Sequence, residues 1–442
     1  MQRRQLIGGL GASAAFAGVA APSARAARPS NIIVIVADDL GYGDLGAYGA
    51  RMVRTPNLDR MAREGMKFTN AYASANICTP SRAGLLTGRY PIRTGLAYDV
   101  VRPNDTNGLP LEEVTIPEAL KPDYATALIG KWHLGHVAPY WPPTVQGFDL
   151  FFGLPYSHDM KPIALYESRP GVELTKEDVD FPRLTERFFA RGARFIDENR
   201  ERPFFLMMAL TAPHYPLQPH PSMAGHSAAG AYGDVVQEID RGVGGLLGQL
   251  RTLGLDRDTL VIVTSDNGPW FEGSSGPLRD RKGGAGWEGG YRVPFLVRQP
   301  GRVPAGKVSD ALTMNIDLMP TLTRWAGKAP PAGVELDGLD IGPVLTKGAA
   351  SPHDDLILFN NEEVAGLRTA RWKYVIRTYY RGSEIPLDAF GYDLLFDMKA
   401  DPGETYDVAT LHPEVAADLA ARVKAAQARF KPLAKGPRRP KA

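Results

Sequence analysis

Apolar runs and polar clusters alternate along this chain in a pattern that predicts strands separated by helices. Four of the runs are almost wholly apolar or β-branched, which is typical of parallel strands that are covered on both faces of a sheet. These predicted strands are residues 31–37, 125–130, 204–210 and 259–265.

Polar side chains follow each of the four predicted strands. Because ligands of open parallel sheets bind at the carboxyl ends of the strands, we expect these side chains to form one shared site. In chain order they are Asp38 and Asp39, Lys131 and His133, His214, and Asp266 and Asn267.

Helical patterns occupy the segments between the strands. The predicted helices cover residues 55–66, 184–198 and 233–253, where apolar residues recur at helical spacing. The first of them has Thr55 as N-cap and Pro56 at its first position. We expect the apolar faces of all three to pack on the core.

The last quarter of the chain has a different pattern. Residues 326–352 are rich in Gly, Pro and Ala, which indicates a boundary near their end. Beyond it, three strand-like runs precede a helix without alternation, as in a small antiparallel α+β domain. The runs are 355–359, 372–379 and 392–397, and the helix begins near Pro413. We therefore predict an α/β catalytic domain over 27–350 with a large, mostly parallel mixed sheet flanked by helices, a C-terminal α+β domain over 351–435, and a loose basic tail over 436–442.

Composition supports a large folded core, because 44% of the 442 residues are hydrophobic and 23% are charged. The formal net charge is +2, and removal of residues 1–26 takes away three arginines and no acid, which leaves −1. A nearly neutral protein has no strong positive electrostatic field that would attract nucleic acid or an anionic membrane. Any bound anion must therefore be held by local groups.

Residues 1–26 have the features of an export signal. Arg3 and Arg4 precede an apolar run of small residues, and residues 24–26 form a small-x-small cleavage site. The paired arginines resemble a twin-arginine signal and predict a periplasmic or secreted protein. A membrane anchor is the alternative, but the run is short for a span, and we expect no membrane span in the mature chain.

The only cysteine, Cys78, has an unusual neighbourhood. A single cysteine excludes internal disulfides and leaves a free thiol. Thr79 can cap a helix that begins at Pro80 and ends at Gly88, so Cys78 would lie where a helix N-terminus stabilises anions. Arg82, one turn into that helix, can point toward the same place. The alternative is that Cys78 is only a small buried hydrophobic residue.

The segment 78–89, C-T-P-S-R-A-G-L-L-T-G-R, resembles the signature of the type I sulfatases, whose cysteine is oxidised to formylglycine. Residues 130–135 (G-K-W-H-L-G) and 266–268 (D-N-G) resemble further family segments, and residues 147–159 resemble the arylsulfatase A branch. Recognisable segments run in family order from about residue 31 to 407. The resemblance implies an alkaline-phosphatase-like superfold and hydrolysis of sulfate esters.

The resemblance also implies a metal site and a modified nucleophile. Asp38, Asp39, Asp266 and Asn267, together with the modified Cys78, would hold one divalent cation. Oxygen ligands suit Ca²⁺, with Mg²⁺ as the alternative. Seen alone, paired aspartates are more often turn formers. As formylglycine hydrate, residue 78 carries two hydroxyls, one to attack sulfur and one whose proton loss releases sulfate.

Roles for the other polar residues follow from the same resemblance. Arg82 and Lys131 would support the nucleophile and the sulfate, and His133 would hydrogen-bond a formylglycine hydroxyl. Lys131 and His133 share a face if the strand continues through Trp132. His214 would contact the sulfate and help protonate the leaving oxygen. A merely structural histidine is the alternative for each.

Two site residues leave alternatives open. Ser157 would add a hydroxyl to the sulfate or, equally, cap its loop. The family's lysine stands five residues before the Glu of E-G-G-x-R-x-P, whereas Lys282 stands six before Glu288. A bulge in the glycines after Lys282 would absorb the difference. We predict Lys282 as the leaving-group acid, with Arg281 as the alternative.

The sequence thus predicts a hydrolase of carbohydrate or aryl sulfates that depends on a formylglycine-generating maturation enzyme. A phosphonate monoester or phosphodiester hydrolase of the same superfold is one alternative, and a silent binder of sulfated glycans is another. The oligomeric state cannot be read from the sequence.

Overall fold

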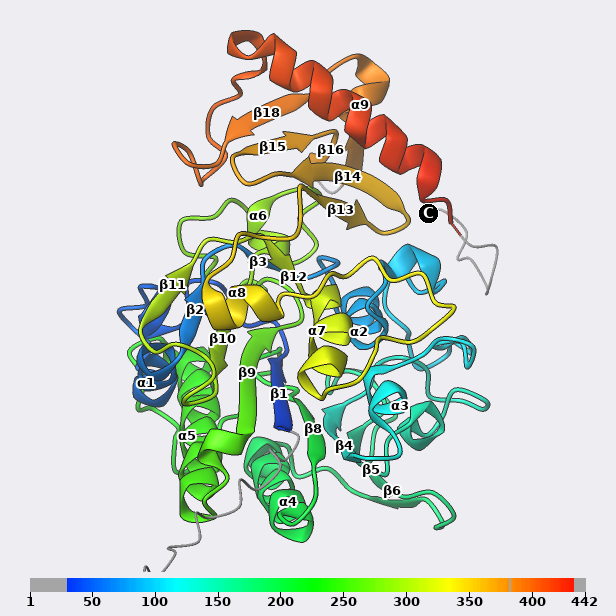
Figure 1. The fold of residues 1–442 in the computed structure, drawn as a ribbon, viewed down its shortest axis with the longest axis vertical. Helices are drawn as coiled ribbons and strands as arrows, with labels where there is room; N and C mark the ends of the chain where they lie inside the picture. The colour runs from blue at the N-terminus through cyan, green and yellow to red at the C-terminus, as the bar shows by residue number, and fades with distance from the viewer. Residues whose placement is uncertain (1–29, 381–382, 433–442) are drawn as a thin grey trace, which may run out of the picture.

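The apolar runs form the centre of a ten-stranded mixed sheet (Figure 1). The computed structural model describes residues 30–380 and 383–432, so the predicted signal (1–26) and basic tail (436–442) lie outside the described residues. The five central strands, β9 to β5 in the following order, are all parallel. The spatial order is β11 (Lys307–Ser309), β2 (Met66–Phe68), β10 (Phe295–Arg298), β9 (Thr259–Ser265), β1 (Asn31–Ala37), β8 (Phe204–Ala209), β4 (Ala125–Lys131), β5 (Leu150–Leu154), β6 (Leu165–Ser168) and β7 (Thr175–Glu177).

Strand β1 shows why these runs are apolar at every position. All seven of its residues are buried, and alternate side chains enter two different cores. Ile33 and Ile35 point into one core, whereas Val34 and Val36 point into the other. Because successive side chains of a strand face opposite ways, a sheet covered on both faces needs apolar residues throughout.

Helices cover both faces of the sheet. One core is closed by α1 (Pro56–Glu64), α4 (Leu184–Asn199) and α5 (Gly230–Thr252). The other is closed by α2 (Cys78–Thr87), α3 (Ile116–Leu120), α7 (Leu318–Trp325) and α8 (Gly342–Lys347). Among the described residues, none of these helices is both long and apolar enough to cross a bilayer. Met66, expected at the end of the first helix, instead begins β2, because α1 stops at Glu64.

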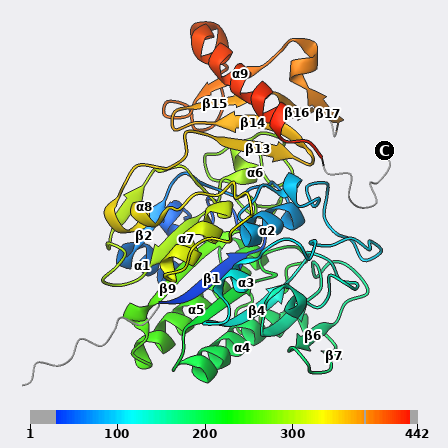
Figure 2. The ribbon, with the colours of Figure 1, turned by 45° about the vertical axis from the view of Figure 1, so that its right-hand side comes forward.

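The C-terminal part forms a separate unit of two layers, a sheet and a helix, next to the large sheet domain, seen at the top of Figure 1 and again in Figure 2. Its antiparallel sheet has the order β13 (Leu356–Asn360), β14 (Glu363–Arg368), β15 (Trp372–Val375) and β18 (Leu394–Asp397). Helix α9 (Pro413–Arg429) packs on it through Leu419 and Val423. The predicted fold class, a mostly parallel α/β sheet with a small antiparallel α+β unit, is confirmed.

Two details of this unit differ from the prediction. The run 372–379 is not one strand, because β15 ends at Val375 and β16 (Arg377–Tyr380) pairs with β17 (Ser383–Pro386). Strand β14 was not predicted. Gly366 interrupts the short apolar pattern of this strand. Glycine is needed at that position because a Cβ would lie only 2.5 Å from the Tyr374 carbonyl oxygen.

Candidate active site

The polar residues that follow the parallel strands do meet at one edge of the sheet. Strands β1 and β9 lie side by side with Ala37 opposite Ser265, so the segments after them emerge together. The Asp39 backbone N–H donates to Asp266 Oδ1 at 3.2 Å. The Asn267 side chain donates to Asp39 Oδ1 at 2.7 Å. The two acidic clusters therefore form one group.

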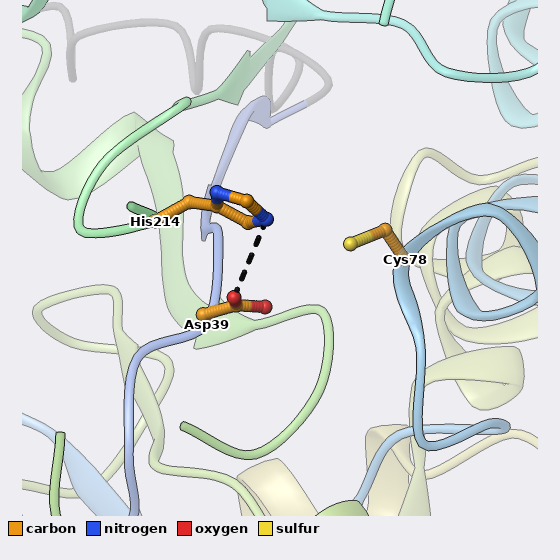
Figure 3. Close-up of side chains that lie close together, drawn as sticks. All are labelled: Asp39, Cys78 and His214. Atoms are coloured by element: carbon orange, nitrogen blue, oxygen red, sulfur yellow. Dashed lines mark ion pairs between the residues drawn. The ribbon is translucent and has the colours of Figure 1, made fainter. Parts of the chain in front are cut away.

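Cys78 enters this group from helix α2. The helix begins at Cys78 itself with Ile77 as N-cap, so the expectation that Thr79 caps it is wrong. The Thr79 hydroxyl is used elsewhere, because it donates to the His133 carbonyl oxygen at 2.8 Å. Gly88 ends the helix in the left-handed conformation, as predicted. Figure 3 shows the Cys78 side chain directed toward Asp39 and His214.

Each of the three aspartates is paired with a cation. Lys131 Nζ lies 2.7 Å from Asp38 Oδ2, and Lys282 Nζ lies 2.8 Å from Asp39 Oδ2. The Arg82 guanidinium contacts Asp266 Oδ2 through Nε at 2.9 Å and through Nη2 at 2.8 Å. The pairs balance in charge, so the protein groups alone make a nearly neutral centre.

Burial dominates the electrostatics around Cys78. It raises the pKa of the Cys78 thiol to about 12, against the opposing effect of Lys131 and Lys282. The thiol is therefore protonated at neutral pH, with Sγ 3.5 Å from Asp38 Oδ1. Burial also opposes ionisation of Asp38, but Lys131 and Arg82 outweigh it and hold the pKa of Asp38 well below its ordinary value.

His133 lies beside this centre in a conformation that was not predicted. Strand β4 ends at Lys131, and His133 has a positive φ of 61°, so the assumption that the strand continues is wrong. Trp132 does pack into the core. His133 Nε2 must carry hydrogen, because it lies 3.0 Å from the Val101 carbonyl oxygen. Burial, with Lys131 and Arg82, lowers the pKa of His133, so Nδ1 is an acceptor, and this buried atom has no hydrogen-bond partner within residues 30–380 and 383–432.

His214 lies beside Asp39, and Ser157 lies beside His214. His214 Nε2 is 3.6 Å from Asp39 Oδ2, the contact drawn in Figure 3, and 3.5 Å from Ser157 Oγ. His158, to which the sequence pointed only as part of a motif, packs its ring 5.7 Å from that of His214. Burial, reinforced by His214, lowers the pKa of His158 to about 4. The sequence indicated a role for His158 only in that it directly follows Ser157.

Lys282 and Arg281 point to different places. Lys282 reaches Asp39, whereas the Arg281 guanidinium lies 5.0 Å from the centre of the Phe271 ring. Gly283 and Gly286 have φ values of 78° and 73°, which side chains other than glycine rarely adopt. The glycine segment thus takes up the additional residue before Glu288 and leaves Lys282 at the carboxylates.

The group also has the donor chemistry of a divalent cation site. Ligand atoms of Asp38, Cys78 and Asp266 lie within 4.8 Å of one another. Asn267 donates its amide hydrogens to Asp39 Oδ1 and to the Gly268 carbonyl oxygen, while its own Oδ1 is buried without a protein partner. Carboxylate and amide oxygens are the ligands that calcium and magnesium prefer. The residues present therefore fit such an ion.

A compact group of buried cations and carboxylates around a helix N-terminus, at the carboxyl edge of an α/β sheet, is suited to bind and act on an anionic substrate. The cations can receive the anionic part of a substrate next to Cys78.

Comparison with known proteins names the family. Residues 30–328 match the family model described as Sulfatase, and residues 285–429 match that described as N-sulphoglucosamine sulphohydrolase, C-terminal. Human arylsulfatase A is 40% identical over 88% of this chain and 86% of its own length. The rat N-acetylgalactosamine-6-sulfatase is 40% identical over 74% of this chain and 67% of its own. Among solved structures, the PsFucS1 sulfatase of Pseudoalteromonas sp. superimposes with a TM-score of 0.85 at 29% identity, covering 93% of this chain and 92% of that one.

The chain belongs to the sulfatase family and is a sulfuric ester hydrolase. The resemblance to type I sulfatases of the arylsulfatase A branch is thereby confirmed.

Proposed function

We propose that this chain hydrolyses carbohydrate or aryl sulfates through a formylglycine made from Cys78, assisted by one divalent cation. The observation that carries the proposal is the position of Cys78. Its side chain is buried at a helix N-terminus, between carboxylates that suit a cation and cations that suit a sulfate. By analogy with the relatives' names, the alcohol part is a sugar or an aromatic group.

Formylglycine hydrate supplies two hydroxyls on one carbon, one to attack sulfur and one whose deprotonation lets sulfate leave. This needs a maturation enzyme that oxidises Cys78. With a twin-arginine signal, oxidation would precede export to the periplasm or the medium. His133 Nδ1, an acceptor without a partner, is suited to hold a hydroxyl of residue 78.

Asp38, Asp39, Asp266 and Asn267 would hold the cation, which we propose to be Ca²⁺ with Mg²⁺ as the alternative. It would polarise a sulfate oxygen. A divalent ion also turns the balanced set of three carboxylates and three cations into a positive centre, which favours an anionic ester.

The remaining residues are assigned by their positions. Lys131 and Arg82 orient Asp38 and Asp266 and contribute positive charge next to residue 78. Lys282, a partly accessible cation on Asp39, would protonate the leaving oxygen, with His214 beside it. Ser157 Oγ, within reach of His214, would donate to the sulfate.

The decisive experiment combines mass spectrometry with activity. Peptide mass spectrometry of active, exported protein is expected to show an aldehyde at position 78, and Cys78→Ala is expected to lose activity by a factor on the order of 10³ or more. Cys78→Ser, which replaces the thiol by a single hydroxyl, serves as the control matched for size and polarity.

Released sulfate should be measured on sulfated sugars and aryl sulfates, with a phosphonate monoester and a phosphodiester for comparison. An unmodified thiol in fully active protein, or wild-type turnover by Cys78→Ala, would overturn the formylglycine proposal. Faster turnover of the phosphorus esters would overturn the assignment of the substrate.

A further inference from the structure

Two large aromatic side chains are exposed next to the catalytic group. Trp270 and Phe271 are separated from the Asp266–Asn267 segment by only two residues and are 39% and 68% exposed. Their rings pack edge to face, with centroids 4.6 Å apart and planes at 76°. Adjacent exposed aromatic rings beside a site usually serve binding, because exposure of apolar surface is otherwise unfavourable.

Trp270, one member of the aromatic pair, lies next to Lys282. Lys282 Nζ is 5.9 Å from the centre of the Trp270 ring and 2.8 Å from Asp39 Oδ2. The two segments are also joined by the backbone, since the Lys282 N–H donates to the Pro269 carbonyl oxygen at 3.0 Å. A group attached to an oxygen that Lys282 protonates would therefore leave the centre beside Trp270.

Arg281 holds the aromatic pair in place. Its guanidinium lies over the Phe271 ring and donates to the carbonyl oxygens of Phe271 and Trp270 at 3.3 and 3.5 Å. A pair held in this way loses little conformational freedom when a ligand packs on it. Arg281 thus has a place in the structure that does not require it to be the leaving-group acid.

We propose that Trp270 and Phe271 form the subsite for the alcohol part of the substrate, and that this part is a pyranose sugar. The inference rests on the proposed function, because it takes Lys282 as marking the leaving oxygen. An aromatic face is electron-rich and attracts the C–H face of a sugar ring. Glu272 is exposed and follows Phe271 in the sequence, and Arg281 lies over the Phe271 ring, so an acceptor and the remaining guanidinium N–H groups are available near the pair, which suits a polyhydroxylated ring and not a plain aryl group.

The test compares pyranose monosulfates with 4-nitrophenyl sulfate as substrates of the matured full-length enzyme. Trp270→Ala and Phe271→Ala are each expected to raise KM for the preferred sugar sulfate by about 5- to 10-fold, with kcat changed by less than about 2-fold. Trp270→Phe should retain most of the affinity. The inhibition constant of inorganic sulfate, which probes the sulfate pocket alone, should not change.

Val172→Ala is the matched control, since Val172 is an exposed apolar residue in the turn after β6. Strand β6 is antiparallel to β5, so this turn lies at the edge of the sheet away from the catalytic group. An unchanged KM in the Trp270→Ala enzyme, an equal rise for the aryl sulfate, or a wild-type enzyme that accepts aryl sulfates only would overturn the inference. A wild-type enzyme that releases sulfate from no ester would instead overturn the proposed function, and the inference with it.

Discussion

Two buried acceptor atoms of the catalytic group, His133 Nδ1 and Asn267 Oδ1, have no hydrogen-bond partner among the residues that the structure describes. Buried polar atoms in folded proteins are almost always hydrogen-bonded, so exceptions at a site indicate where a ligand belongs. In both residues the other polar atom is already engaged, by Val101 or by Asp39 and Gly268, and this fixes the orientation of the side chain. The free acceptors are thus part of a prepared site.

Removal of the Asn267 amide oxygen is expected to weaken cation binding. At about 100 times the dissociation constant, Ca²⁺ should stabilise the wild-type protein by about 2.7 kcal/mol, and a chelator should reverse the effect. Asn267→Ala should weaken calcium affinity by roughly 10- to 100-fold. Thermal unfolding and calorimetric titration measure both effects without reference to activity.

Asn31→Ala is the control for this experiment. Asn31 is also a buried asparagine with an unpartnered Oδ1, but it lies at the opposite end of β1 from Asp38. The Asn31→Ala substitution should lower the melting temperature and leave the calcium-dependent increase in melting temperature unchanged. A calcium effect that survives in Asn267→Ala at full size would contradict the assigned ligand set.

Lys282 and Arg281 are adjacent cations whose side chains have different partners in the structure, Asp39 for Lys282 and Phe271 for Arg281. Lys282→Ala is expected to lower kcat by about 10²- to 10⁴-fold, the usual range for a general acid, whereas Arg281→Ala should lower it by less than about 10-fold. The loss in Lys282→Ala should shrink for aryl sulfates whose alcohol is strongly acidic, because such leaving groups need no proton. Steady-state kinetics on a series of aryl sulfates gives the answer, and equal losses in both variants would reject the assignment.

Helix α7 is tied at its start to the segment that leads into β13. The Asp317 carboxylate accepts hydrogen bonds from the Leu339 backbone N–H and from His353 Nε2, both at 2.8 Å. Burial opposes the positive charge of His353, but Asp317 outweighs it and raises the pKa of His353 above its ordinary value of 6.5. The ion pair thus joins an element of the large core to the start of the C-terminal sheet.

The stability from this pair should depend on pH. A raised folded-state pKa means that the contribution is fully present below 6.5 and is lost as the pH rises through the folded pKa. His353→Gln is expected to lose roughly 1–3 kcal/mol of unfolding free energy at about pH 5.5 and much less at about pH 9. Unfolding curves at both pH values measure this, with the exposed His226→Gln as control. A cost that is the same at both values would disprove it.

The contact between the two parts of the molecule contains a buried charge cluster. Lys373 Nζ in β15 lies 2.9 Å from Glu288 Oε1 in α6 (Glu288–Tyr291) and 2.6 Å from Glu404 Oε1. Burial opposes ionisation of Glu288, but Lys373, Arg368 and Arg292 outweigh it and lower its pKa to about 2. Burial raises the pKa of Glu404 to about 7. The C-terminal sheet thus supplies the cation that the E-G-G-Y-R segment needs.

Removal of this cation should destabilise the whole molecule. Lys373→Met leaves Glu288 and Glu404 buried together, with an expected cost of roughly 3–5 kcal/mol, whereas Lys424→Met on the exposed face of α9 should change stability by less than about 0.5 kcal/mol. The double variant Lys373→Met/Glu404→Gln should recover part of the loss. Chemical denaturation measures all three, and a Lys373→Met protein as stable as wild type would contradict the role of the cluster.

Prediction from the sequence succeeded where a local pattern decides the structure. Strands β1 and β9 have the predicted bounds, because an unbroken β-branched run has few alternatives to a covered strand. It failed where a tertiary contact competes with a local preference. Thr79 is a good N-cap residue, yet its hydroxyl donates to the His133 carbonyl oxygen, and the helix begins at Cys78, two residues before the predicted start at Pro80.

The domain boundaries and the individual roles of the site residues stay predictions, but the residues themselves do come together. Patterns along the chain were sufficient to place four of the five central parallel strands, to collect the polar residues at their carboxyl ends and to identify the sulfatase family. They were not sufficient to pair Lys282 with Asp39, to place His158 against His214, or to hold Trp270 over the catalytic group. Lys282 and Asp39 are 243 residues apart, and a contact at that separation depends on how the sheet brings its strand ends together, which no local pattern encodes.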